Sequence, residues 1–236
     1  MEIHKVKPIH TWRDFAKELG TIVLGIIIAI SLEHFVEEWS WEKEVTAARQ
    51  AIHAEMTANN ENLFAFRIAI APCVDQELAK ADRILTALEA GRDPGVATSL
   101  RVPAVTLVRD AELQSERASQ VLTHFPRPEL ALISRYYAQL PDFRGFGSAE
   151  STAWGRLRLL PKLPKGITAA DLIDLRANLR AAQDAEYLMV LNAKRQLRVS
   201  QQLGLARPTV DPVRVRNWCT LDTDAYRRYR SSQDLR

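Results

Sequence analysis

Glycine is scarce in this sequence, and no charge of one sign predominates. Only nine of the 236 residues are glycine, and long stretches contain neither glycine nor proline, which favours helices. Lysine and arginine together number 32, against 29 aspartates and glutamates, so no global field points to nucleic acid as a partner. Hydrophobic residues make up 47% of the chain, which excludes a wholly disordered protein and supplies a core.

Sequence motifs typical of catalytic, phosphate-binding or metal-binding sites are also missing. "GFGS" at residues 145–148 lacks the six-position glycine frame and the lysine of a phosphate loop. No acid, base and nucleophile occur together at a recognisable spacing. We therefore predict a protein that is not an enzyme, with no catalytic residue, no metal ion and no cofactor. The histidines, none of which pairs with another at metal-ligand spacing, are His4, His10, His34, His53 and His124.

One stretch, "ELGTIVLGIIIAISLEH", has no charge between Glu18 and Glu33. Fourteen helical residues reach only about 21 Å, which is less than the roughly 30 Å of membrane hydrocarbon. Aromatic residues on both flanks lengthen the apolar body. Tryptophan rings also gather at membrane–water interfaces. We therefore predict a transmembrane helix over residues 15–36, with interfacial anchors at Trp12, Trp39 and Trp41.

Two alternatives remain open for this stretch. Its length suits a signal peptide, and Ala29–Ser31 loosely resembles a cleavage site, but Asp14 and Glu18 stand where such a peptide is basic. A core helix of a soluble domain is the other alternative. That alternative would have to explain why "IVLGIIIAI" is apolar on every side, because a surface helix carries an apolar stripe instead.

The charges beside the stretch predict its orientation. Basic residues stay on the cytoplasmic side of a span. We therefore expect residues 1–14 to form a cytoplasmic head and the remainder to face the periplasm from a bacterial inner membrane. The basic residues before the span are Lys5, Lys7, Arg13 and Lys17, and the acidic ones after it are Glu33, Glu37, Glu38, Glu42 and Glu44.

Small residues recur along one line of the predicted span. Thr21, Gly25 and Ala29 are four residues apart, so they stack on one face of a helix. Small side chains in line allow the backbone of another helix to approach closely, although glycine and alanine are common in spans generally. The expected partners are membrane lipid and other integral membrane subunits or a second copy of the chain.

The remaining pattern predicts an all-α fold, an antiparallel helical bundle on a membrane stalk. Residues 37–204 would form the periplasmic bundle, and the Arg-rich residues 205–236 a tail packed on it. The longest later helix should begin at Thr168, which forms a capping box with Asp171. The full set of predicted helices is 11–70, Pro72 to Gly91, a weaker one at 109–125, 126–140 ended by Pro141, a short one near 148–160 in a loop-rich region, and 168–203 ended by Gly204.

The only two cysteines are Cys73 and Cys219. Outside the cytoplasm disulfides persist, so we predict that these two residues are bonded, the alternative being two buried thiols. A helix that ends near residue 70 would place Cys73 at the far end of the bundle. Bridged cysteines need Cα atoms within about 7 Å. On that basis we expect the helix from Thr168 to run away from the membrane, parallel to the first.

The block "WRDFAKELGTIVLGIIIAISLEHFVEEWSWEKEV" resembles the opening of a family of uncharacterised bacterial proteins. Members have a short basic head, a span with a "GxxxxGIxIA" core, and an aromatic, acidic segment that leads into a helical extracytoplasmic domain. The resemblance covers about the first 60 residues. It implies a single-span anchored protein and no known activity or substrate.

Two functions are consistent with these features. The first is a non-enzymatic accessory or scaffold subunit that packs its span and its periplasmic bundle against a larger inner-membrane assembly. The second is a periplasmic ligand-sensing bundle that acts through a partner, because helical bundles bind small molecules between their helices. The short head argues against the second function, since it has no room for a signalling domain.

Overall fold

The structure is a computed structural model that describes residues 12–94, 99–103, 107–160 and 167–220. Every regular element in these ranges is helical, which confirms the all-α prediction. Most of the predicted head and the last sixteen residues of the predicted tail, 221–236, lie outside the described residues. The elements are α1 (Trp12–Asn59), η1 (Asn60–Ala65), α2 (Phe66–Glu89), α3 (Ala111–Ala118), η2 (Val121–His124), α4 (Arg127–Ala138), α5 (Leu140–Leu157), α6 (Ala169–Gln202) and α7 (Pro212–Thr220).

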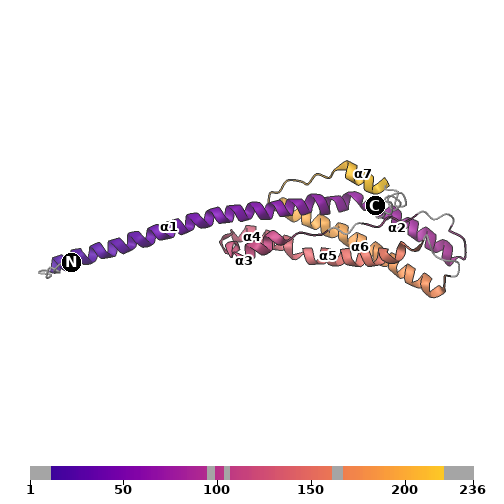
Figure 1. The fold of residues 1–236 in the computed structure, drawn as a ribbon, viewed down its shortest axis with the longest axis horizontal. Coiled ribbons are helices and arrows are strands. Elements are labelled where there is room, and N and C mark those ends of the chain that lie inside the picture. The colour runs from indigo at the N-terminus through magenta and orange to yellow at the C-terminus, as the bar shows by residue number, and fades with distance from the viewer. Residues whose placement is uncertain (1–11, 95–98, 104–106, 161–166, 221–236) are drawn as a thin grey trace, which may run out of the picture.

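The first three elements form one continuous helical rod (Figure 1). The prediction that the first helix ends near residue 70 and a second begins at Pro72 is wrong, because Pro72 lies inside α2. An interior proline costs about 3 kcal/mol. The helix nevertheless continues because the residues beyond Pro72, among them Val74, Leu78 and Leu85, are buried on one face. Packing of that face outweighs the lost hydrogen bond.

The rod changes its winding at η1, a π-helical segment, and not at the proline. A buried polar network holds this segment in place. The Tyr136 hydroxyl donates to Asn60 Oδ1 at 3.1 Å, and Asn60 Nδ2 donates to Ser200 Oγ at 2.9 Å. The widened turn thus directs Asn60 toward partners on α4 and α6, which satisfies an amide that would otherwise be buried without hydrogen bonds.

After α2 the chain returns toward the C-terminal half of α1. Asn59 exchanges two hydrogen bonds with the backbone of Arg109, at 2.8 and 3.0 Å, and His124 of η2 stacks on Trp41. The single weak helix predicted over 109–125 is divided into α3 and η2. Gln120, with φ +64°, separates them, because a residue in the left-handed region ends the α-helix.

The region predicted to be loop-rich after Pro141 is an eighteen-residue helix, α5. Proline is tolerated in the first turn of a helix, where its missing N–H has no intrahelical partner, and Pro141 lies in that turn of α5. Phe143, Trp154 and Leu157 are buried along its inner face. Their burial compensates for the three glycines of α5, each of which costs roughly 1 kcal/mol relative to alanine in a helix interior.

The predicted start of α6 is confirmed. Thr168 accepts a hydrogen bond from the Asp171 N–H at 3.2 Å, and Asp171 accepts one from the Thr168 N–H at 2.9 Å. Just beyond the other end of α6, Gly204 has φ +79°, a conformation that glycine adopts without strain. Local sequence signals therefore located both ends of this helix.

The predicted direction of α6 is wrong. Its first turns carry Arg176, which pairs with Glu89 at the far end of α2, and its last turns carry Ser200, which bonds Asn60. Thus α6 runs opposite to the rod, and Thr168 lies at the far end of the molecule. The expectation failed because α2 continues beyond Cys73 to Glu89, so the disulfide does not mark that end.

Buried side chains form two clusters along the rod. The N-proximal core lies between α1, η1, α3, α4 and the end of α6 and includes Ile52, Met56 and Tyr136. The distal core lies between α2, α5 and the first half of α6 and includes Leu85, Trp154 and Leu179. Val210, Val215 and Trp218 pack against the distal core, so the described part of the C-terminal tail folds back onto the bundle.

Candidate functional site

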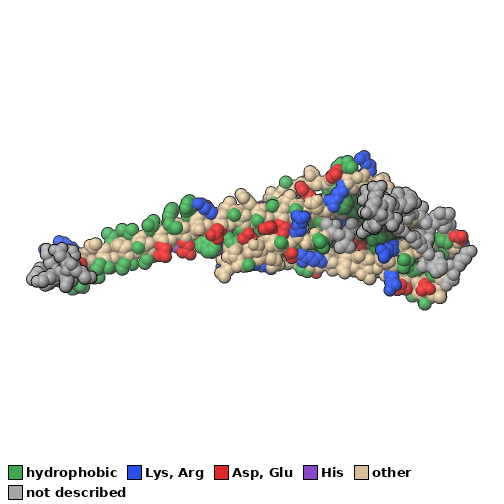
Figure 2. All heavy atoms as spheres, viewed as in Figure 1, with side chains coloured by type: hydrophobic (Ala, Val, Ile, Leu, Met, Phe, Trp, Pro, Cys, Tyr) green, Lys and Arg blue, Asp and Glu red, His purple; other side chains and the backbone are tan. Residues whose placement is uncertain are grey.

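The first half of α1 has no contact with the bundle. Residues 15–40 are all exposed, and Figure 2 shows their hydrophobic side chains along a helix that extends alone from the rest of the molecule. Within the described ranges, one helix is long and apolar enough to cross a membrane, and none of its apolar window is buried. A core helix of a soluble domain would be covered by other elements, so that alternative does not fit.

The small-residue line on this helix is open. Thr21, Gly25 and Ala29 are exposed, and a Cβ atom built on Gly25 would meet nothing within 4 Å. The Thr21 hydroxyl donates to the Lys17 carbonyl at 2.9 Å within the helix. Because that hydroxyl is already satisfied, the line presents a smooth surface without an unmet polar group.

The three tryptophans predicted as interfacial anchors divide into two kinds. Trp12 and Trp39 are 79% and 55% exposed on the free part of α1. Trp41 instead packs against the N-proximal core, and its ring stacks on His124 with 3.9 Å between the centroids. One face of Trp41 is therefore covered by η2, and its assignment as an interfacial anchor stays a prediction.

A buried ion-pair triad joins three helices between the two cores. Arg67 of α2 donates through Nη2 to both Glu150 of α5 and Glu186 of α6. The three residues are 4%, 5% and 4% exposed. The triad was not among the sites predicted from the sequence. One signal was available, since each charge occupies a position within the apolar stripe of its own helix, between residues such as Phe66 and Ile70.

Burial and attraction oppose each other in the triad. Burial lowers the pKa of Arg67, and the charge of Glu150 works against this shift. Burial likewise raises the pKa of Glu150, and the Arg67 guanidinium works against that shift. Arginine starts from so high a pKa that Arg67 stays protonated. One cation thus faces two carboxylic groups in a largely buried part of the bundle.

A cavity of about 270 Å³ lies beside the triad. Arg67 and Glu150 form its polar part, and most of the remaining wall is apolar. At the wall, Arg144 Nη2 pairs with Asp110 Oδ2 at 2.9 Å. The apolar lining comes from η1, α2, the segment before α3, α5 and α6, and comprises Leu63, Phe66, Ile70, Leu107, Val108, Phe143, Gly147 and Met189.

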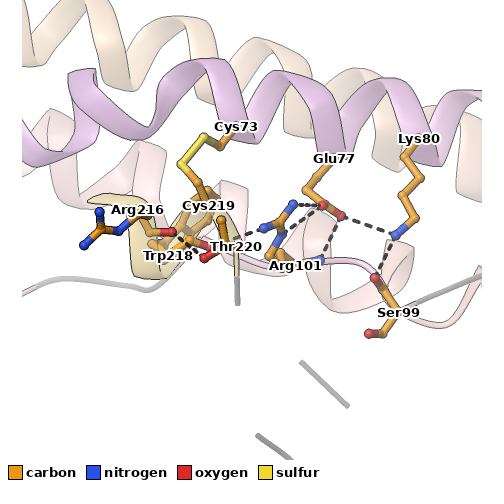
Figure 3. A network of polar contacts seen from close by, with 9 residues as sticks. All are labelled: Cys73, Glu77, Lys80, Ser99, Arg101, Arg216, Trp218, Cys219 and Thr220. Atoms are coloured by element: carbon orange, nitrogen blue, oxygen red, sulfur yellow. Dashed lines mark hydrogen bonds and ion pairs between the residues drawn. A yellow bond between two sulfur atoms is a disulfide. The ribbon is translucent and has the colours of Figure 1, made fainter. Parts of the chain in front are cut away.

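A second network of contacts connects the C-terminal tail to α2 (Figure 3). Cys73 and Cys219 form a disulfide, with their Cα atoms 5.6 Å apart. One turn further along α2, Glu77 accepts hydrogen bonds from the Arg101 side chain at 2.6 and 2.9 Å and from the Arg101 N–H at 3.0 Å. Arg101 also donates to the Trp218 carbonyl at 3.5 Å. Two chain segments remote in sequence are thus tied to the same face of α2.

Other groups in the described part of the chain are not arranged for metal binding: no three histidine, cysteine, aspartate or glutamate side chains there are placed to hold an ion. His53 lies near Glu129 and Arg49, and burial lowers its pKa. No protein-family model, no curated protein and no solved structure matches this chain.

Proposed function

We propose that this protein is a non-enzymatic accessory or scaffold subunit of a bacterial inner-membrane assembly, anchored by one span with its bundle in the periplasm. The observation that carries the proposal is the exposed apolar half of α1, which continues without a break into the bundle. An apolar helix surface of this length requires lipid or another helix around it.

The short distance between span and bundle supports a role in assembly. The predicted span ends at Val36, and the bundle begins at Trp41, where η2 first contacts α1. Five residues of helix correspond to about 8 Å. In the proposed arrangement the bundle therefore sits directly over the lipid headgroups. A partner in the membrane would meet both the small-residue line and the lower end of the bundle.

The proposed topology rests on the charges beside the span. Lysines and arginines precede it and glutamates follow it, which favours a cytoplasmic N-terminus and a periplasmic C-terminus. We expect a C-terminal alkaline phosphatase fusion to be active and a C-terminal fluorescent protein of the cytosolic type to be dark. The reverse pattern would overturn the topology. The N-terminal sequence of the membrane-bound protein distinguishes a retained span from a signal peptide cleaved near Ser31.

The assembly itself is tested by substitutions on opposite faces of the span. Gly25→Leu holds two helix backbones apart, whereas Ile27→Leu changes the shape of a side chain on the other face. After cross-linking in native membranes, we expect the wild type and Ile27→Leu to give the same defined complex with an integral membrane protein or a second copy. Gly25→Leu should give much less of it.

One result would contradict this proposal, and another would contradict the small-residue line as the contact. If all three proteins migrate alone after cross-linking, the apolar surface contacts lipid only and the scaffold function is excluded. If the complex forms equally in all three, the small-residue line is not the contact, and the partner must bind elsewhere on the molecule.

A further inference from the structure

The C-terminal helix α7 lies on the surface of the bundle (Figure 1). None of its nine residues is buried, and its apolar side chains reach the distal core only through Val215 and Trp218, which are partly buried. Isolated helices shorter than about 12 residues are marginal in water. The helical form of α7 thus depends on its docking against α2.

The polar contacts that α7 makes with other described elements are long. Arg214 donates to the Asn62 carbonyl at 3.2 Å and to Asn62 Oδ1 at 3.4 Å. Arg101 donates to the Trp218 carbonyl at 3.5 Å, and the Arg214 guanidinium lies 4.0 Å from the centroid of the Phe66 ring. Hydrogen bonds from N–H groups are usually 2.7–3.2 Å long, and exposed cation–π contacts are weak. Each of these contacts therefore contributes little to the docking of α7.

The disulfide adds a covalent connection to these contacts. Cys219 is in the last turn of α7, and its partner Cys73 lies on α2, so the bond anchors the short helix to the bundle. Both cysteines are partly exposed. The bond thus lies at the surface, where the thiolate of a dithiol can attack a sulfur atom.

The remainder of the bundle has a core of its own. Leu85, Trp154 and Leu179, from α2, α5 and α6, are 0%, 0% and 1% exposed. No residue of α7 is buried, so α7 adds no buried side chain to this core. The triad of Arg67 joins the same three helices. Loss of α7 would therefore leave the packing of these helices in place.

We propose that α7 is a redox-controlled strap, kept docked on α2 by the Cys73–Cys219 bond and released when a dithiol reduces that bond. In the exchange, two electrons and two protons pass from the dithiol to the two cysteines, and the dithiol becomes a disulfide. Release withdraws Arg214 from the Asn62 carbonyl of η1 and from the Phe66 ring, which uncovers this part of the rod. The strap goes beyond the proposed membrane assembly, because it uses no residue of the free half of α1.

The test measures hydrogen exchange of the full chain in lipid nanodiscs, with and without dithiothreitol as the dithiol. With the bond intact, the amides of α7 should be protected. After reduction they should exchange at least about tenfold faster, because a helix of this length does not persist once it is released. Amides near Leu85 and Leu179 should stay protected over the same labelling times.

Two neighbouring residues of α7 provide matched variants. Cys219→Ser removes the bond. Thr220→Ser, one residue later, retains the bond and keeps a hydroxyl like the one that donates to the Arg216 carbonyl at 2.8 Å. We expect Cys219→Ser to show fast exchange of α7 both with and without dithiothreitol. Thr220→Ser should respond to dithiothreitol as the wild type does.

Two results would overturn the strap. If the α7 amides stay protected after reduction and in Cys219→Ser, the weak contacts alone hold the helix and the bond does not control its docking. If the amides near Leu85 and Leu179 lose protection together with those of α7, the bond supports the whole bundle and no separate strap exists.

Discussion

The two halves of α1 differ in their apolar content and in their surroundings. Residues 15–40 are all exposed, whereas Ile52 and Met56, further along the same helix, are 0% exposed. The first half is apolar on every side, and the second carries its apolar residues in a stripe opposite to polar ones. A stripe needs one covering layer, which the bundle supplies. A helix segment that is apolar on every side needs an apolar environment all around it, and the bundle does not cover this segment.

The strongest test of this difference places the same charge in each half. Ile52→Asp buries an unpaired carboxylate in the N-proximal core and should destabilise the bundle by about 4 kcal/mol or more. Ile27→Asp should leave the unfolding of the bundle unchanged but disfavour membrane insertion by about 2.5–3.5 kcal/mol. Denaturant unfolding measures the first effect, and resistance of the membrane-bound protein to carbonate extraction measures the second. Equal unfolding curves for the two variants would contradict the division of α1.

The disulfide should affect only the bundle. It joins residues 146 positions apart, and its reduction should lower the free energy of unfolding by about 2–4 kcal/mol. Membrane association through the free half of α1 should not change. Unfolding is measured with and without a reductant, and Cys219→Ser serves as the control. A reductant that shifted the Cys219→Ser transition as far as that of the wild type would show an effect unrelated to the bond.

The boundary between the halves can be located with two tryptophans. Trp41→Ala removes the ring stacked on His124 and should cost about 1–2 kcal/mol of bundle stability. Trp39→Ala, two residues earlier, removes a ring that is 55% exposed and should change stability by less than about 0.5 kcal/mol. Thermal unfolding of the two variants under the same conditions measures the difference. The opposite order would move the boundary toward the N-terminus.

The smallest expected effect concerns Glu150, a buried acidic residue of the bundle. Burial raises the pKa of Glu150, so folding favours its protonated form. The resulting stabilisation is complete below the unfolded-state pKa, near 4.3, and is lost as the pH rises through the higher folded-state pKa. The stability of Glu150→Gln does not include this loss, so it should rise relative to that of the wild type as the pH increases from 4 to 7. Parallel stability profiles of the two proteins over this range would contradict the shift.

Much of the secondary structure was predictable because its signals are local. Thr168, Asp171 and Gly204 define the ends of α6 through contacts within a few residues. The scarcity of glycine and the apolar stripes predicted helices throughout. Proline was a weaker guide, because its effect depends on position and packing. Pro72 was assigned as a helix start and lies inside α2, whereas Pro141, assigned as the end of a helix, does stand at the boundary between α4 and α5.

The candidate cavity and its triad were not predictable in this way. Glu150 and Glu186 lie 83 and 119 positions after Arg67 in the chain. Nothing in the local sequence around these three residues indicates that their charges will meet. Each alone resembles a surface residue that interrupts an apolar stripe. Their contact requires that α2, α5 and α6 pack side by side, which is a property of the complete bundle.

The sequence by itself determined the helical class, the free apolar segment and the limits of α6, because these follow from propensity, periodicity and capping within a few turns. Only the tertiary structure decided where the rod ends, which way α6 runs and which side of Trp41 is covered. Those outcomes depend on packing energies between segments remote in the chain. A buried face such as that of Val74, Leu78 and Leu85 can carry a helix through a proline that would end it in isolation.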